Sequence, residues 1–282
     1  EGSITLPVKK LHSIAREVGG SQLNLVVKND ACTIESGAFS TRVKGLPAEE
    51  FPPMPEFQEQ NSIILEQAKV KSMLRRTAYA VSIDENRYVL NGLFLSFKEK
   101  KITMVATDGR RLALTEEEAE LSQENPTEII VPTKAIQELN RQLGEEGEVE
   151  IKITENQASF STGKKEEGEA QVITKLVEGA YPNYKQVIPA ESKYRVTMDK
   201  EELLHALKRA DIMTSDKANS VKLTFTENNL MLTSNTPEVG ESKETMAISY
   251  SGEETSIAFN PQYFIDPLKA LEEEEINFEF TD

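Results

Sequence analysis

The chain has 282 residues, which is long for a single hydrophobic core and suits two or three domains of ordinary size. It is 38% hydrophobic and 28% charged, and it has neither an apolar run near the ~20 residues of a membrane helix nor a basic start leading into an apolar stretch; a soluble, cytoplasmic protein is expected. The net charge of −16 argues against nucleic-acid binding by an evenly charged surface, so the distribution of charge along the chain becomes the question.

Few side chains suit a metal or a disulfide. Cys32 is the single cysteine, which excludes an intrachain disulfide and fits a reducing compartment. His12 and His205 are the two histidines, too few for a cluster of nitrogen and sulfur ligands. We expect no metal and no cofactor.

The first segment, residues 4–19, predicts a strand end followed by a helix. Pro7 suits the first helical turn, and Gly19 suits a C-terminal cap. One face of this helix is apolar and is formed by Val8, Leu11, Ile14, Ala15 and Val18. Strands are predicted next over 23–27 and 32–36 with a turn at 29–30, and the prolines within 52–55 mark a boundary.

A second helix is predicted over residues 69–82, and a hairpin follows it. The helix has an apolar face formed by Val70, Met73, Leu74, Thr77 and Val81. Apolar residues then alternate through Leu93, Leu95 and Phe97, and again at Ile102 and Met104, on either side of a charged tip at 98–101. This period of two predicts a pair of antiparallel strands.

The hairpin ends in a specific string, Ala-Thr-Asp-Gly-Arg-Arg-Leu-Ala at 106–113, and Leu-Asn-Gly stands at 90–92. Asp108 and Gly109 are turn formers, and Arg110 and Arg111 precede apolar Leu112. Together these strings closely resemble the middle domain of the bacterial DNA polymerase III beta subunit, the sliding clamp. Many members of that family carry His at the position of Arg110.

The rest of the chain repeats two half-units. The strand and helix of the first segment return at 129–141 and 257–265, and its hairpin returns at 153–163. The helix and hairpin of 69–104 return at 203–215, where Leu204, Leu207 and Ile212 are expected to point inward, and at 221–232. A spacing of about 125 residues suits a duplicated domain rather than a solenoid.

The order of half-units predicts a chain that opens and stops within a domain. We therefore expect part of a clamp chain without its first helix and hairpin and without its last strands, since unpaired strand edges are costly. The expected limits are the second half of domain 1 over 1–57, domain 2 over 58–190, and the first part of domain 3 over 191–282.

The resemblance implies an α+β fold of repeated clamp domains, with antiparallel sheets outside and helices lining a central hole. Two chains would close head to tail into a pseudo-sixfold ring around duplex DNA, as a processivity factor that slides without base readout. Its implied partners are double-stranded DNA, the replicative polymerase, the clamp loader, other clamp-motif proteins and a second copy of the chain. No membrane partner is expected.

Basic residues concentrate on the predicted helices, and acidic ones concentrate in loops and strand ends. A solvated helix face explains any one such helix, but repetition favours a common cationic lumen. The residues expected to face DNA are Lys9, Arg16, Lys69, Lys71, Arg75, Arg76, Arg87, Lys134, Arg141, Lys208 and Arg209. The third unit weakens the pattern, because Asp199, Glu201, Glu202 and Asp211 offset its cations.

Two further sites follow from the family pattern. The joint between chains would involve Val43, Ile212 and Met213, although an Ile-Met pair is equally typical of a core. Partner peptides with apolar and Gln anchors would enter a pocket formed by Leu90, Thr107, Gly109, Arg110, Arg111, Leu112, Pro182, Val187, Asn260 and Tyr263. Gln186 and Ala218 depart from some relatives and predict a shallower pocket. Leu112 and Val187 are equally typical of core positions.

Two other classes of protein remain open. An enzyme could use Asp108 beside Arg110 as a charged pair, but the sequence has no Gly-rich phosphate loop, nucleophile elbow or zinc spacing, so no catalytic residue is expected. The glutamates at 272–275 are typical of a solvated helix end. A peptide-binding scaffold that never encircles DNA is the other alternative.

Overall fold

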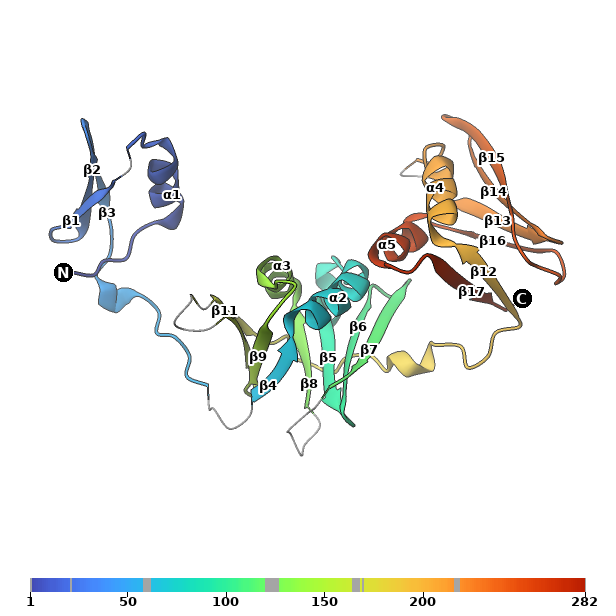
Figure 1. Cartoon of the computed structure of the whole chain (residues 1–282), viewed down its shortest axis with the longest axis horizontal. Helices are drawn as coiled ribbons and strands as arrows, with labels where there is room; N and C mark the ends of the chain where they lie inside the picture. Colours follow the sequence, from blue (N-terminus) through green and yellow to red (C-terminus); the bar gives the residue numbers. More distant parts are fainter. Residues whose placement is uncertain are drawn as a thin grey trace. The chain divides into compact units, whose positions relative to one another are not determined.

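The computed structural model describes residues 2–20, 22–57, 62–119, 127–163, 168, 170–215 and 219–281 (Figure 1). Contacts divide the chain into two compact units, residues 1–56 and 57–282. Among the described residues no helix is long and apolar enough to span a membrane. Within the same residues, no group of three or more His, Cys, Asp or Glu side chains could hold a metal ion.

The first unit packs one helix with a three-stranded sheet. Helix α1 (Val8–Glu17) precedes β1 (Asn24–Val27), β2 (Ala31–Ser36) and β3 (Phe39–Lys44), which pair antiparallel in the order β1-β2-β3. Cys32 and Ile34 of the central strand are fully buried. The apolar face predicted for this helix is not buried in this unit: no α1 residue is buried, and Val8 is 75% exposed.

The second unit begins with two four-stranded sheets. One has the order β7-β6-β5-β8, formed by β5 (Gly92–Lys98), β6 (Lys101–Thr107), β7 (Leu112–Glu118) and β8 (Thr127–Pro132). The other has the order β11-β10-β9-β4, formed by β4 (Ser62–Glu66), β9 (Glu148–Ile153), β10 (Gln157–Thr162) and β11 (Ala170–Lys175). The predicted hairpin is confirmed, with Glu99 and Lys100 in the left-handed region at its tip.

Two helices cover one face of these sheets. They are α2 (Gln67–Thr77) and α3 (Thr133–Gln142), and their apolar residues share one core with the sheets. The inward face predicted for 69–82 is confirmed at Val70, Met73, Leu74 and Thr77. The helix ends earlier than predicted, because Thr77 begins a tighter 3-10 turn, η3 (Ala78–Ala80), and its hydroxyl donates to the Met73 carbonyl at 2.8 Å.

The last part of the second unit builds a further core. Strands β13 (Val221–Thr226), β14 (Asn229–Thr236), β15 (Gly240–Ala247) and β16 (Thr255–Phe259) form a sheet in the order β15-β14-β13-β16. Strand β12 (Tyr194–Asp199) pairs with β17 (Glu275–Phe280), and helices α4 (Lys200–Asp211) and α5 (Gln262–Ala270) pack against each other. Aromatic rings around Phe225 fill the interior.

Helix α4 is displaced from its predicted limits. It begins at Lys200, because the Asp199 carboxylate accepts the Glu202 N–H at 2.7 Å and caps the helix. It ends at Asp211. The predicted inward positions Leu204 and Leu207 are confirmed, whereas Ile212 lies beyond the helix and is 68% exposed, so its inward orientation is wrong.

Candidate functional site: a turn joined to a helix

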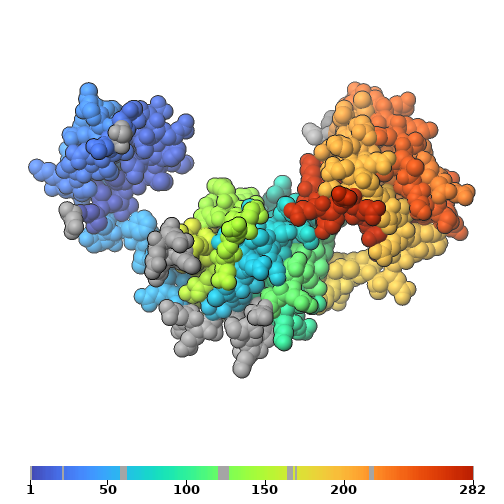
Figure 2. Space-filling model, viewed as in Figure 1, coloured from blue at the N-terminus to red at the C-terminus, as the bar shows by residue number. Residues whose placement is uncertain are grey.

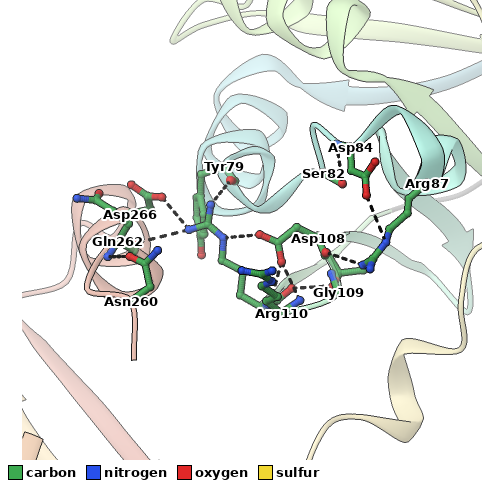
Figure 3. A network of polar contacts seen from close by, with 12 residues as sticks. Tyr79, Ser82, Asp84, Arg87, Asp108, Gly109, Arg110, Asn260, Gln262 and Asp266 are labelled. Carbon is green, nitrogen blue, oxygen red and sulfur yellow. Dashed lines mark hydrogen bonds and ion pairs between the residues drawn. The ribbon is translucent and has the colours of Figure 1, made fainter. Parts of the chain in front are cut away.

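The string at 106–113 forms the tight turn between β6 and β7. Both the Arg110 and Arg111 N–H groups donate to the Asp108 carboxylate, at 2.9 and 3.0 Å (Figure 3). The Thr107 hydroxyl donates to the Arg111 carbonyl at 2.7 Å and accepts the Gly109 N–H at 3.1 Å. Gly109 has φ +84°, a conformation that favours glycine. Side-chain hydrogen bonds therefore fix the turn.

This turn directs the Arg111 side chain onto helix α5. Its guanidinium donates to the Asp266 carboxylate at 2.7 Å and to the Gln262 carbonyl at 3.4 Å. It also donates to Asp108 at 3.2 Å and to the Tyr79 carbonyl at 2.9 Å. These four hydrogen bonds occupy most of the five N–H groups of a guanidinium.

Arg111 is thus a joint between the middle and last parts of the second unit. Its side chain is only 19% exposed, and its guanidinium carbon lies 5.5 Å from the centre of the Tyr79 ring and 5.2 Å from that of Tyr263. Burial raises the pKa of Tyr79 to about 12, although the Arg111 charge opposes the shift. The expected polar rim for a peptide is therefore corrected at Arg111, whose donors are used within the chain.

Asp108 has a structural role in this network. Its carboxylate accepts two backbone N–H groups and pairs with Arg111, whereas the expected charged pair was with the Arg110 side chain. Arg110 is exposed. The arrangement therefore offers Arg110, rather than Asp108, to an incoming ligand.

The α5 side of the candidate pocket is held by its own polar contacts. Asn260 accepts the Gln262 N–H at 2.9 Å, which fixes the start of α5. The Gln262 side chain donates to Asp211 at 2.9 Å and connects α5 with α4. Tyr263 stands half-buried beside Arg111. The structure therefore brings two predicted α5 residues together with the predicted turn.

The apolar candidates differ in exposure. Leu112 is half-buried and packs on a cluster of Phe94, Val105 and Ile130, whereas Pro182 is exposed. Val187 is 69% exposed, so the core interpretation is wrong there. Leu90 is half-buried at the end of η4 (Glu85–Leu90).

The segment after β11 is held against the middle sheet by aromatic stacking. The Tyr181 ring stacks on Phe94 with centroids 5.0 Å apart, and Tyr184 lies 5.9 Å from the same ring. Burial raises the pKa of Tyr181 to about 12. A groove of about 850 Å³ runs beside these rings, and among its lining residues are Phe94, Tyr181, Pro182 and Tyr184.

Arg87 lies on η4 and contacts the 107–112 turn. Its guanidinium donates to the Asp108 carbonyl at 3.3 Å and lies 3.6 Å from the Asp84 carboxylate (Figure 3). It packs so closely on Gly109 that a Cβ there would meet its nitrogen at 2.5 Å. The expected contact of Arg87 with DNA stays a prediction.

The other ten candidate DNA contacts lie on helices, and five of them pair with an acid. Lys71 pairs with Glu145 at 2.5 Å, Arg141 with Glu138 at 3.2 Å, and Arg209 donates to Glu244 at 2.9 Å. The Glu244 contact raises the pKa of Arg209, and that of Glu244 is lowered in return. The predicted segregation of acids away from helical cations is therefore wrong at Lys71 and Arg209. Lys9, Arg16, Lys134 and Lys208 are exposed.

The predicted joint residues lie at strand edges and loop positions. Val43 is half-buried on β3, an edge strand of the first sheet. Met213 is half-buried, and its sulfur lies 3.6 Å from the position a Cβ would take on Gly240 of edge strand β15. With Ile212 exposed beside it, a pure core interpretation of the Ile-Met pair fails.

Sequence reasoning missed several partners in the site. The residues around Arg111 are Tyr79, Gln262 and Asp266. The segment after β11 packs on the middle sheet through Tyr181 and Tyr184. Gln262 and Asp266, spaced four apart at the start of a predicted helix, were a usable signal for one polar face. Gln186 is exposed in η5 (Tyr184–Gln186), while Ala218 lies outside the described residues.

Two family models match successive parts of the chain. Residues 64–183 match the central domain of the DNA polymerase III beta subunit, and residues 185–282 match its C-terminal domain. The domain limits predicted at 57/58 and 190/191 stay predictions.

Individual relatives extend the match to the whole chain. The beta sliding clamp of Chlamydia pneumoniae is 35% identical over 285 residues, covering 100% of this chain and 76% of that protein. The beta sliding clamp of Bacillus subtilis is 31% identical, covering 99% of this chain and 74% of that protein.

Solved structures agree. The DNA polymerase sliding clamp of Bacillus subtilis superposes with a TM-score of 0.92 at 30% identity, covering 99% of this chain and 74% of that one. A sliding clamp from Pseudomonas aeruginosa bound to griselimycin gives 0.90 at 29% identity, covering 99% and 75%. The predicted α+β clamp fold is confirmed. The chain belongs to the family of the bacterial DNA polymerase III beta subunit, the beta sliding clamp.

Proposed function

We propose that this protein is a processivity factor that encircles duplex DNA as a ring-shaped dimer and slides without reading sequence. The observation that carries the proposal is the match of the whole chain to beta sliding clamps, in sequence and in fold. Helices that carry Lys and Arg would line the hole and contact phosphates, which carry no sequence information. Val43 on one chain and Ile212 with Met213 on the other would form the joint.

The partner site would be the surface formed by the 107–112 turn, the 182–187 segment and the start of α5. Exposed Pro182 and Val187 with half-buried Leu90 and Leu112 supply apolar contacts, and Arg110, Asn260 and Tyr263 supply polar ones. Thr107 and Gly109 would shape the turn. Polymerase, clamp loader and other clamp-motif proteins would bind here by short peptides.

The protein would act by binding and not by catalysis. Asp108, the strongest catalytic candidate, has its carboxylate engaged by two backbone N–H groups and Arg111. Those contacts hold a turn together and leave no activated base.

Primer extension tests the proposal. With a bacterial replicative polymerase, a clamp loader and excess competitor template, adding this protein should lengthen the products of single binding events at least tenfold. Unchanged product lengths would contradict the proposed function.

A further inference from the structure

Two consecutive arginines of α2 are paired with two consecutive glutamates that follow α5. Arg75 lies 2.5 Å from the Glu272 carboxylate, and Arg76 lies 3.1 Å from that of Glu273. The two segments are almost 200 positions apart in the chain, yet α2 contacts α5, and Figure 2 shows red atoms of the α5 region against the cyan and green middle part. We call these two pairs the arginine–glutamate ladder.

The ladder differs from the Arg111 joint in its access to solvent. The side chains of Arg75 and Glu272 are 42% and 67% exposed, and those of Arg76 and Glu273 are 28% and 51% exposed. Exposed ion pairs add little to stability, because water screens them and ordering long side chains costs entropy. The ion pairs of the ladder can therefore break at little cost in free energy, whereas the four hydrogen bonds of Arg111 stay formed.

The glutamates resemble phosphates in the chemistry they offer to arginine. A carboxylate and a phosphate both accept the parallel N–H donors of a guanidinium. Backbone N–H groups at Glu273 and Glu272, together with the Arg76 charge, lower the pKa of Glu273. An anion of the chain itself thus occupies the cations that a phosphate backbone would contact.

We propose that the ladder is an internal competitor for duplex DNA: Glu272 and Glu273 must release Arg75 and Arg76 before these arginines can bind phosphates. This inference rests on the proposed function and goes beyond it, because it assigns to two acidic residues the control of how tightly the ring holds DNA. The competition lowers the affinity for DNA and makes that affinity less dependent on salt concentration. Weaker contacts with phosphates favour sliding over static binding.

The test is a salt titration with a short fluorescent duplex, read by anisotropy, on the intact protein. The double variant E272Q/E273Q keeps side-chain size and frees both arginines. The slope of log affinity against log salt should steepen by up to about 1.8, since each phosphate contact contributes about 0.9. Between 200 and 50 mM salt, the variant should therefore gain up to about tenfold more affinity than the unsubstituted protein.

Neighbouring acids provide a matched control. Glu274 and Glu275 are exposed, and E274Q/E275Q removes the same charge without touching the ladder. Its slope should stay that of the unsubstituted protein. Adding R75Q/R76Q to E272Q/E273Q should abolish the gained slope. Melting curves of all variants check that the fold is intact.

The outcomes separate the two proposals. Equal slopes for E272Q/E273Q and E274Q/E275Q, with measurable binding in both, would overturn the ladder as a competitor and leave the clamp function standing. A gained slope that survives R75Q/R76Q would overturn the ladder in the same way. No duplex binding by any form at 50 mM salt would overturn the ladder as a competitor, whereas the clamp function is decided separately by retention on circular plasmid.

Discussion

Arg111 shows how one side chain can hold a site together. It stands in a turn fixed by Asp108 and Thr107, and it reaches a helix 151 and 155 positions further along, at Gln262 and Asp266. Because its side chain is mostly buried, each hydrogen bond is stronger than it would be in water. Loss of a partner would therefore lower the free energy of unfolding.

Asp266→Asn tests this residue-scale account. Removing the carboxylate leaves a part-buried guanidinium without its main counter-charge, so the free energy of unfolding should fall by about 1–3 kcal/mol in urea titrations. Glu279→Gln is the control, because it breaks the exposed pair with Arg195 and should cost less than about 1 kcal/mol. Equal losses of stability in both variants would contradict the claim that Arg111 joins the middle and last parts of the second unit.

Val187→Asp tests the partner site at a position that the fold does not need. Val187 is 69% exposed, so a carboxylate there should leave the melting temperature nearly unchanged while placing a charge in an apolar contact. Binding of a short clamp-motif peptide with apolar and Gln anchors, measured by calorimetry, should weaken at least tenfold. Ile64→Asp alters a 53% exposed apolar residue on β4 and should bind normally; normal binding by both variants would refute the assignment.

At the scale of elements, the segment after β11 packs against strands β5 and β8. Tyr181 and Tyr184 pack on Phe94, and the Val177 N–H donates to the Ile130 carbonyl at 2.9 Å. This segment is therefore fixed at one end, and the exposed Val187 follows the fixed part.

The stability of this docking should depend on pH. Tyr181 has a pKa near 12 in the folded protein and about 10 when unfolded, so folding favours the neutral phenol. Its contribution is complete below pH 10 and is lost as the pH rises from 10 to 12. Unfolding of Tyr181→Phe should therefore show a shallower loss of stability across that window than the unsubstituted protein.

The exposed Tyr88 supplies the comparison for that experiment. Tyr88→Phe should follow the pH curve of the unsubstituted protein, because Tyr88 is 60% exposed. If Tyr181→Phe also follows that curve, the Tyr181 phenol is not responsible for the loss of stability between pH 10 and 12.

Local pattern predicted the elements better than their partners. Alternation gave the hairpin of β5 and β6, and helical spacing gave the buried face of α2, because both signals depend on neighbours within a few residues. The limits of α4 were wrong, since a capping contact at Asp199 moved its start. Ile212 was placed inward by a helical period that had already ended.

The sequence predicted which positions belong to the candidate site, but it did not predict which of their side chains contact one another. The motif at 106–113 identified the turn, yet nothing local shows that Arg111 meets Asp266 or that Arg75 meets Glu272. Such pairs depend on how distant segments approach one another. For the same reason the segregation of acids and cations, inferred from runs along the sequence, was wrong where folding brought Glu145 to Lys71.

At the scale of the whole molecule, the proposal requires two copies. Ile212 is the exposed apolar residue at the proposed joint, and Ile212→Asp should convert a dimer into a monomer at micromolar concentration by light scattering. Its melting should change little, because the side chain is outside the core. Ile83→Asp, at a 96% exposed position away from the joint, should remain a dimer; a monomeric unsubstituted protein would count against the ring.

The central claim is topological, so the most direct measurement is retention on DNA with and without ends. The protein is loaded on nicked circular plasmid with a clamp loader and ATP, freed of unbound protein by gel filtration, and the plasmid is then cut once. We predict that the protein stays on the circle and leaves within minutes of linearisation, since a ring slides off an end. Equal retention on circular and linear plasmid would contradict encirclement.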